Sequence, residues 1–258
     1  MMRFSSFQVN SLFIDRIGNR WISRGLFLFV LILSIATNLW PIGDTDFSKY
    51  FDSLDTFLKW MNTYSNASIT VVPTAIVWPV LTAGNVLFLT FSFLMVFVYV
   101  LISVIYAHVY VGEKIGLSKE QISKLFLSRL PQLILFFLII VMLTVFFNFF
   151  FLFLIPALFF APILIFVEKK NPIDSILYSF RYSSGYKFSI FWNLLTLYCM
   201  FSLAEQIVFI ILPEGSNAGI FLHGFFMAFV VLAIGRSMGI FYELIRANTL
   251  HQNTEQQK

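Results

Sequence analysis

Two ionisable residues stand inside long apolar stretches, where charged groups are costly and are often functional. Glu205 lies about 26 Å along a helix that begins near Phe188, at 1.5 Å per residue. His223 lies a few residues into the next apolar stretch, at a similar depth near the outer boundary of a membrane. A Glu205–His223 pair would gate a proton or bind a polar ligand. The alternative is that both are interfacial residues, satisfied by water or by each other.

Other polar residues in the apolar stretches are scattered. Ser189, Asn193 and Thr196 share one helix face, but the polar residues that follow drift around the helix at spacing three. They predict no continuous polar path toward Glu205. Single polar residues elsewhere predict hydrogen bonds between helices rather than binding sites: Asn85, His108 and Asn148.

Motifs for catalysis are missing. The sequence has no HExxH pair, no phosphate-binding glycine loop, and no serine or cysteine nucleophile with a histidine base. Its lone cysteine, Cys199, excludes an intramolecular disulfide and a metal cluster held by cysteines. We therefore predict no enzyme, no catalytic residue, no metal and no cofactor.

The composition is that of an integral membrane protein. Hydrophobic residues make up 59% of the 258 positions and charged residues only 12%, about half the share in soluble domains. Uncharged runs are long enough to span a bilayer. We predict an all-α, polytopic helical membrane protein, a single domain over 1–258 with amphipathic interfacial helices and about six transmembrane helices: Gly25–Trp40 with residues from Trp21 onward, Asn85–Tyr110, Leu133–Leu152, Ile155–Val167, Phe188–Leu212 and Asn217–Met238.

Polar segments separate these spans. We expect an interfacial segment at 1–24, a polar outer loop at 44–70, amphipathic connectors at 112–130 and 171–186, and a polar tail at 246–258. Ile69–Val80, which contains two prolines, is expected to be an outer interfacial or re-entrant piece. Leu133–Val167 is flanked by basic residues on both sides, so it must reverse, and Pro156 is the expected break. A re-entrant hairpin that does not fully cross is the alternative to two joined spans.

The basic residues fix the expected orientation. Of the 17 lysines and arginines, 15 fall in segments assigned to the inner side, which agrees with the positive-inside rule. Both termini should therefore be cytoplasmic, and the net charge of +4 is explained by anionic lipid headgroups without nucleic acid. Arg236, near the inner end of the last span, is expected to snorkel into the headgroups.

Local signals predict the connectors in more detail. Ser118 and Gln121 form a capping box before a surface helix, and Asn171-Pro172 starts a second one that Gly185 can end. In this second helix the apolar residues Ile173, Ile176, Leu177 and Phe180 share one face, and Asp174, Ser175, Ser179 and Arg181 take the other. In the last span, a stripe of small residues favours packing inside the bundle over a homodimer seam: Gly224, Ala228, Gly235 and Gly239.

About thirty residues resemble a known pattern. An apolar span with Ala161-Pro162, an acidic Glu168, and a short amphipathic helix ending in Ser179-Phe180-Arg181 resemble the YciC-like bacterial inner-membrane proteins. They also resemble the membrane domain fused to some glycerophosphodiester phosphodiesterases. The resemblance implies a bacterial cytoplasmic membrane and a six-span helical fold. It implies no catalytic residue, because the phosphodiesterase chemistry belongs to a separate soluble domain.

Two classes of function remain open. The first is a non-enzymatic envelope scaffold or accessory subunit, with its basic inner connectors in contact with lipid, a membrane protein partner or a second copy of the chain. The second is a small secondary transporter, permease subunit or lipid-handling protein with Glu205 and His223 in its pathway. The lipid bilayer is the expected partner in both cases.

Overall fold

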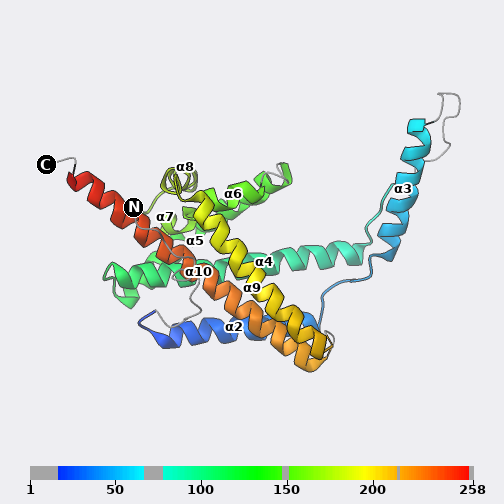
Figure 1. Ribbon diagram of the computed structural model, residues 1–258, viewed down its shortest axis with the longest axis horizontal. Helices are drawn as coiled ribbons and strands as arrows, with labels where there is room; N and C mark the ends of the chain where they lie inside the picture. Colours follow the sequence, from blue (N-terminus) through cyan, green and yellow to red (C-terminus); the bar gives the residue numbers. More distant parts are fainter. Residues whose placement is uncertain (1–16, 67–77, 147–150, 214–215, 256–258) are drawn as a thin grey trace. The chain divides into compact units, whose positions relative to one another are not determined.

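The computed structural model describes residues 17–66, 78–146, 151–213 and 216–255 as helices joined by turns (Figure 1). Among these described residues, five helices are long and apolar enough to cross a membrane, and Leu154–Val167 adds a shorter apolar stretch. The prediction of an all-helical, multi-pass membrane protein is confirmed. The helices are α2 (Arg20–Leu39), α3 (Ser48–Asn66), α4 (Ala83–Lys114), α5 (Lys119–Phe146), α6 (Phe151–Leu158), α7 (Ala161–Val167), α8 (Pro172–Tyr182), α9 (Lys187–Ile211) and α10 (Asn217–Glu255).

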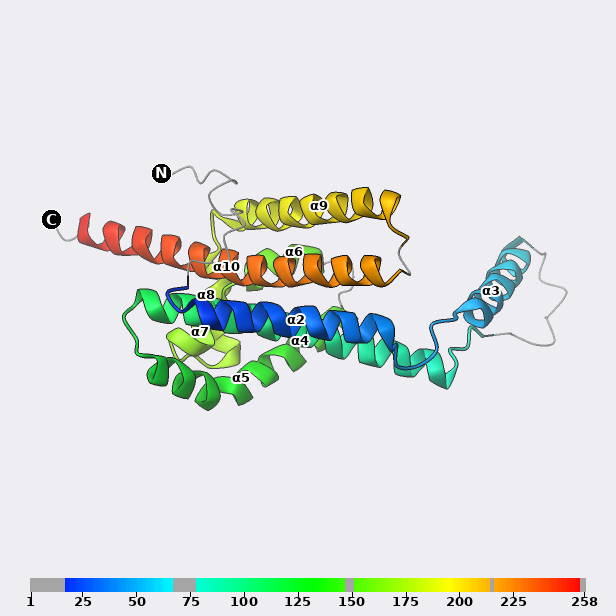
Figure 2. The ribbon, with the colours of Figure 1, turned by 90° about the horizontal axis from the view of Figure 1, so that it is seen from below.

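The chain forms two compact units. Unit 1 contains Met1–Ile35 and Tyr99–Lys258, and unit 2 contains Ala36–Val98. In unit 1, α9 and α10 run side by side (Figures 1 and 2). The glycines of α10 allow other helices to approach: a Cβ on Gly224 would lie 3.1 Å from Ile35 of α2, and one on Gly235 only 2.3 Å from the carbonyl oxygen of Ser103 on α4. The small-residue stripe thus packs inside the bundle, as predicted.

Helix α2 begins and ends at exposed tryptophans. Trp21 is 78% exposed in its first turn, and Trp40, directly after its last residue, is 70% exposed. The 20 residues of α2 span about 30 Å, the thickness of the hydrocarbon core of a bilayer. Tryptophan favours the two membrane interfaces. The prediction that the first span extends back to Trp21 is confirmed, because α2 begins at Arg20 and is long enough to cross the hydrocarbon core.

Helix α5 differs from the prediction because it unites two expected elements. The surface helix that follows Ser118 and the span that follows Leu133 form one helix, Lys119–Phe146, with Pro131 inside it. Proline removes one backbone hydrogen bond, but a chain entering lipid gains more by keeping all its other backbone groups bonded within the helix. Pro131 therefore does not end α5.

The break in the next segment also lies elsewhere than predicted. Pro156 sits inside α6, and the helix continues to Leu158 before two turn residues, Phe159 and Phe160, lead into α7. Pro162 at the start of α7 explains the position, because it has no N–H to offer to the carbonyl group of Leu158. The stretch Leu154–Val167 is about 21 Å long at 1.5 Å per residue, shorter than a bilayer core. Residues 147–150, which connect α5 and α6 in the sequence, lie outside the described residues.

Unit 2 contains a helix in place of the expected polar loop. Residues 48–66 form α3, because Tyr50, Leu54, Phe57 and Met61 recur at helical spacing and give the segment one apolar face. The buried Asn85 fixes the chain before α3: its amide donates to the carbonyl oxygens of Asp44, at 3.0 Å, and Asp46, at 2.9 Å. Residues 67–70 of the expected loop, and most of Ile69–Val80, lie outside the described residues.

The expected tail also continues the last helix, since α10 extends to Glu255. At the other end of the chain, residues 1–16 of the expected interfacial segment lie outside the described part, and the segment's last residues form the first turn of α2.

Candidate functional site

The structure brings Glu205 and His223 together. Glu205 lies in the last third of α9 and His223 in the second turn of α10, and Nδ1 of His223 bonds Oε1 of Glu205. Their side chains are 26% and 34% exposed. The pair therefore joins the two helices near their connecting turn, where a carboxylate and an imidazole can exchange a proton or contact a polar solute.

A second polar cluster, which the sequence analysis missed, lies at the other end of unit 1. Oε1 of Glu168, just after α7, accepts hydrogen bonds from the hydroxyl groups of Tyr182 and Tyr242, each at 3.0 Å. Its Oε2 lies 3.8 Å from Nζ of Lys170. Burial, together with the charge of Glu168 and the hydrogen bond to it, raises the pKa of Tyr182 to about 12. This tyrosine thus stays a hydrogen-bond donor at neutral pH.

The break between α6 and α7 is bridged by a side chain of α8. The Oγ of Ser179 donates to the carbonyl oxygen of Ala157 at 2.6 Å and accepts from the N–H of Phe160 at 3.2 Å. Ser179 is fully buried, and so is every residue from Ala157 to Phe166. One hydroxyl group thus satisfies backbone groups on both sides of a gap in the apolar core, where such groups are costly if left without partners.

Helix α8 buries its serine residues and exposes part of its apolar face, which is the reverse of a surface helix on a soluble protein. Asn171 occupies the N-cap position with Pro172 after it, as predicted, although the Asn171 side chain makes no capping hydrogen bond. The serines Ser175, Ser179 and Ser183 are buried, whereas Ile173 and Leu177 are 66% and 58% exposed. The predicted division into two faces is only partly right: Ser175 and Ser179 share a face, which packs on the protein, but Asp174 and Arg181, which we expected beside them, are exposed together with Ile173 and Leu177.

Two cations flank an aromatic ring on the outward side of α8. Nζ of Lys170 lies 3.5 Å from the ring centroid of Tyr178, and Cζ of Arg181 lies 6.0 Å from it. Nζ of Lys187 similarly lies 5.0 Å from the ring centroid of Phe180. The basic residues of this connector are thus held by aromatic rings, in cation–π geometry.

The corner between α4 and α5 is tightly built. Leu117 N–H bonds the carbonyl oxygen of Gly112, and Gly116 adopts a φ of 81°, the pattern of a Schellman motif. The predicted capping box is confirmed: Ser118 N–H donates to Oε1 of Gln121 at 2.9 Å, and Gln121 N–H donates to Oγ of Ser118 at 3.3 Å. These bonds fix the direction in which α5 leaves α4.

Helix contacts hold the same corner from the inside. His108 is buried, and its Nε2 donates to the carbonyl oxygen of Ile122 at 3.0 Å, so it makes the interhelical hydrogen bond that we predicted. Glu113, near the end of α4, also accepts hydrogen bonds from the backbone N–H groups of Gly18, at 2.6 Å, and Asn19. It thereby binds the chain that enters α2.

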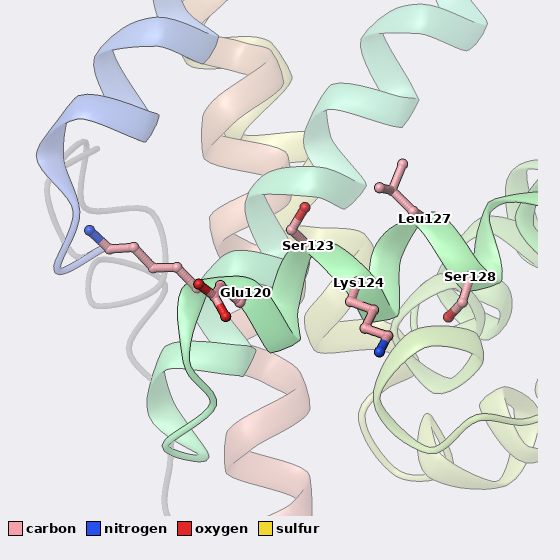
Figure 3. Close-up of a pocket in the computed structure, with 6 residues that line it drawn as sticks. Glu120, Ser123, Lys124, Leu127 and Ser128 are labelled. Carbon is pink, nitrogen blue, oxygen red and sulfur yellow. The ribbon is translucent and has the colours of Figure 1, made fainter.

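A shallow, wide-open surface hollow of about 810 Å³, which we call the α5 groove, lies along the first turns of α5 (Figure 3). Its lining combines charges, hydroxyl groups and one large apolar side chain, Leu127, which is 65% exposed. Ser123 and Leu127 point to one side of the helix, and Lys124 and Ser128 to the other (Figure 3). The groove is lined by Lys119, Glu120, Ser123, Lys124, Leu127 and Ser128.

Two of the remaining polar residues inside the spans make hydrogen bonds to backbone carbonyl groups. Asn85 bonds the chain before α3, and Asn193 donates to the carbonyl oxygen of Ser189 in its own helix. Asn148 lies outside the described residues. The prediction for Arg236 is wrong: its side chain is only 2% exposed and does not snorkel. Helix α10 packs on α4 through Gly235 and Gly239. Arg236 directly follows Gly235, so its side chain is enclosed between the helices as well.

Within the described ranges, no group of three or more histidines, cysteines or acidic residues is placed to hold a metal ion. Cys199 is reduced and exposed on α9. No protein-family model matches the chain. Comparisons with curated proteins and with solved structures likewise find no match.

Proposed function

We propose that this chain is a non-enzymatic accessory subunit or scaffold of the bacterial cytoplasmic membrane, which holds a protein partner at the groove on α5. The resemblance to YciC-like inner-membrane proteins supports the choice of membrane. The groove is the observation that carries the proposal, because it joins an exposed apolar side chain to a charged rim, the composition of a protein interface.

The arrangement of the basic residues supports an orientation with the groove in the cytoplasm. Bonds link the start of α2 to the end of α4, the end of α4 to the start of α5, and the end of α7 to α8 and α10. We call the end of unit 1 that these bonds hold together the basic end, because it contains the basic segments around Lys114–Arg129 and Lys169–Lys187. Basic residues are retained on the cytoplasmic side during insertion, so the basic end faces the cytoplasm.

Rigidity supports a docking role for the groove. The Schellman turn, the capping box and the His108–Ile122 bond all act on the first turns of α5. A surface that is already ordered loses less conformational entropy when a partner binds. Lys119 and Lys124 have no acidic partner within 4 Å in the part of the chain that the structure describes, so both are available to an acidic surface.

Site-specific photocrosslinking in the native membrane tests the proposal. A benzophenone side chain replaces Ser123 in the groove, and a matched control replaces Val86, an exposed residue near the start of α4. We expect a discrete protein adduct from position 123, absent at position 86 and lost when Lys119→Glu and Lys124→Glu are added. Lipid adducts alone at both positions would contradict the proposal, and an adduct of twice the chain mass would make the partner a second copy.

The contact between Glu205 and His223 favours a second candidate function. A secondary transporter, permease subunit or lipid-handling protein would use this pair as a proton or solute contact in its pathway. Glu205→Gln keeps the shape and removes the charge. If the chain transports a solute through this pair, the variant should lose proton-coupled uptake. Unchanged uptake of every responsive solute would exclude the pair from any pathway.

A further inference from the structure

The outward side of α8 combines an apolar stripe with basic residues. Ile173 and Leu177 are 66% and 58% exposed, and Arg181 continues the row at the next turn. At 100° per residue these three positions fall within about 80° around the helix. The Ser179 bridge fixes the opposite face to the core, so the apolar stripe cannot rotate inward.

Lys170 and Arg181 are close enough to bind one anion. They lie 3.5 Å and 6.0 Å from the same ring centroid, that of Tyr178. Nζ of Lys170 and Cζ of Arg181 are therefore at most about 9.5 Å apart. A phosphate group whose oxygens each accept a charge-assisted hydrogen bond of about 2.8 Å is of the size to bridge them. Tyr178, whose ring both cations approach, adds a hydroxyl group as a third donor.

The charges around Tyr178 suit a singly charged anion. Glu168 lies 3.8 Å from Lys170, but its other oxygen is bonded to Tyr182 and Tyr242. Asp174 is one turn before Tyr178 on α8, near the positive end of the helix dipole. The three cations Lys169, Lys170 and Arg181, counted against these two acids, leave one net positive charge in this part of the chain.

We propose that Lys170, Tyr178 and Arg181 bind the phosphodiester of an anionic phospholipid in the cytoplasmic leaflet. Its acyl chains then cover Ile173 and Leu177. A lipid fits better than an acidic peptide because α8 is joined by short turns to two apolar helices, α7 and α9, which keeps it at the bilayer. The site rests on the orientation given under Proposed function, and it does not need a protein at the α5 groove.

Native mass spectrometry of the purified chain, with added phosphatidylglycerol, tests the site. We expect retained phosphatidylglycerol, little retained phosphatidylcholine, and no binding of the soluble headgroup glycerophosphoglycerol. Each cation near the membrane surface contributes about 1 kcal/mol, which is about fivefold in affinity. Lys170→Gln and Arg181→Gln should each weaken retention by about fivefold, and the double variant by about 25-fold, whereas Arg181→Lys should keep most of it.

The matched control is Lys119→Gln with Lys124→Gln, which removes two basic residues from the same end of unit 1. Equal losses in the control would reduce the effect to diffuse attraction and overturn the site, as would undiminished binding in the double variant. Equal binding of phosphatidylcholine, or of the soluble headgroup, would exclude an anionic lipid as the ligand.

Arg181 is exposed, so its variants should fold normally. The crosslink from position 123 should persist in the double variant, which separates the two proposals.

Discussion

The hydroxyl group of Ser179 lies 2.6 Å from the carbonyl oxygen of Ala157, in a part of the core where both residues are buried. The same hydroxyl accepts the N–H of Phe160, so it replaces two helical hydrogen bonds that the break between α6 and α7 leaves open. Irregular backbone is tolerated at membrane depth only where other protein groups satisfy it. Ser179 is therefore the residue that allows the interrupted helix to lie inside the bundle, and it ties α8 to that helix.

Ser179→Ala should destabilise the protein by about 1–3 kcal/mol, because it leaves a buried carbonyl group and a buried N–H without partners. Ser175→Ala is the matched control: Ser175 lies one turn earlier in α8, is equally buried, and its Oγ makes no hydrogen bond within the described residues. We expect the control to be neutral or slightly stabilising. Thermal unfolding in lipid nanodiscs measures both, and equal melting temperatures for the two variants would contradict the bridging role.

Gly235→Ala should also destabilise the protein. The added Cβ would lie 2.3 Å from the carbonyl oxygen of Ser103, so α4 and α10 would have to separate, at a cost of about 1–3 kcal/mol. Gly25→Ala is the matched control, since a Cβ on Gly25 meets no atom within 4 Å and alanine favours a helix. Unfolding in the same nanodiscs should show a lower melting temperature for Gly235→Ala alone. A tolerated alanine at position 235 would mean that the two helices are not in close contact there.

The burial of Tyr182, together with its contact with Glu168, should make stability depend on alkaline pH. The pKa of Tyr182 is raised to about 12 in the folded protein, against about 10 when unfolded. Its stabilising contribution is thus complete below pH 10 and is lost as the pH rises from 10 toward 12, where the unfolded state binds fewer protons. Melting temperatures of the wild type should fall over this interval, and those of Tyr182→Phe should fall less. Parallel curves for the two proteins would show that the tyrosine does not contribute.

The proposed orientation predicts which positions a membrane-impermeant maleimide can reach. In a chain with Cys199→Ser, a cysteine at Asp52 of α3 should be labelled from outside intact cells. A cysteine at Ser123 of α5 should be labelled only after the membrane is permeabilised. Both side chains are exposed on the chain itself, so the difference reports the side of the membrane. Labelling of position 123 in intact cells would place the basic end outside.

Much of this fold could be predicted from the sequence because hydropathy and charge act locally. The apolar runs gave the positions of α2, α4, α9 and α10, and Ser118 with Gln121 gave the start of α5. In contrast, the periodicity of α8 reveals neither which face is buried nor that Arg181 lies on the exposed side with Leu177. In lipid the surroundings are as apolar as the core, so small polar residues such as Ser179 pack inward while Leu177 points outward.

The candidate sites divide in the same way. Glu205 and His223 could be paired from depth along two neighbouring helices, and the structure places them in contact. The Glu168 cluster could not be predicted, because Tyr242 lies far from Glu168 in the sequence and only tertiary packing brings them together. The prediction that Arg236 snorkels fails for a related reason. Its distance along α10 does not reveal that α4 packs beside it and buries its side chain.

The mass of the particle extracted gently from its own membrane tests the central claim, a protein partner held at the α5 groove. The tagged wild-type chain should carry a second polypeptide in a fixed ratio, above the 29.9 kDa of one chain. Lys119→Glu with Lys124→Glu should lose it, whereas Lys49→Glu on α3 should keep it. A wild-type particle that contains one chain and lipid alone, or a partner indifferent to Lys119 and Lys124, would contradict the account.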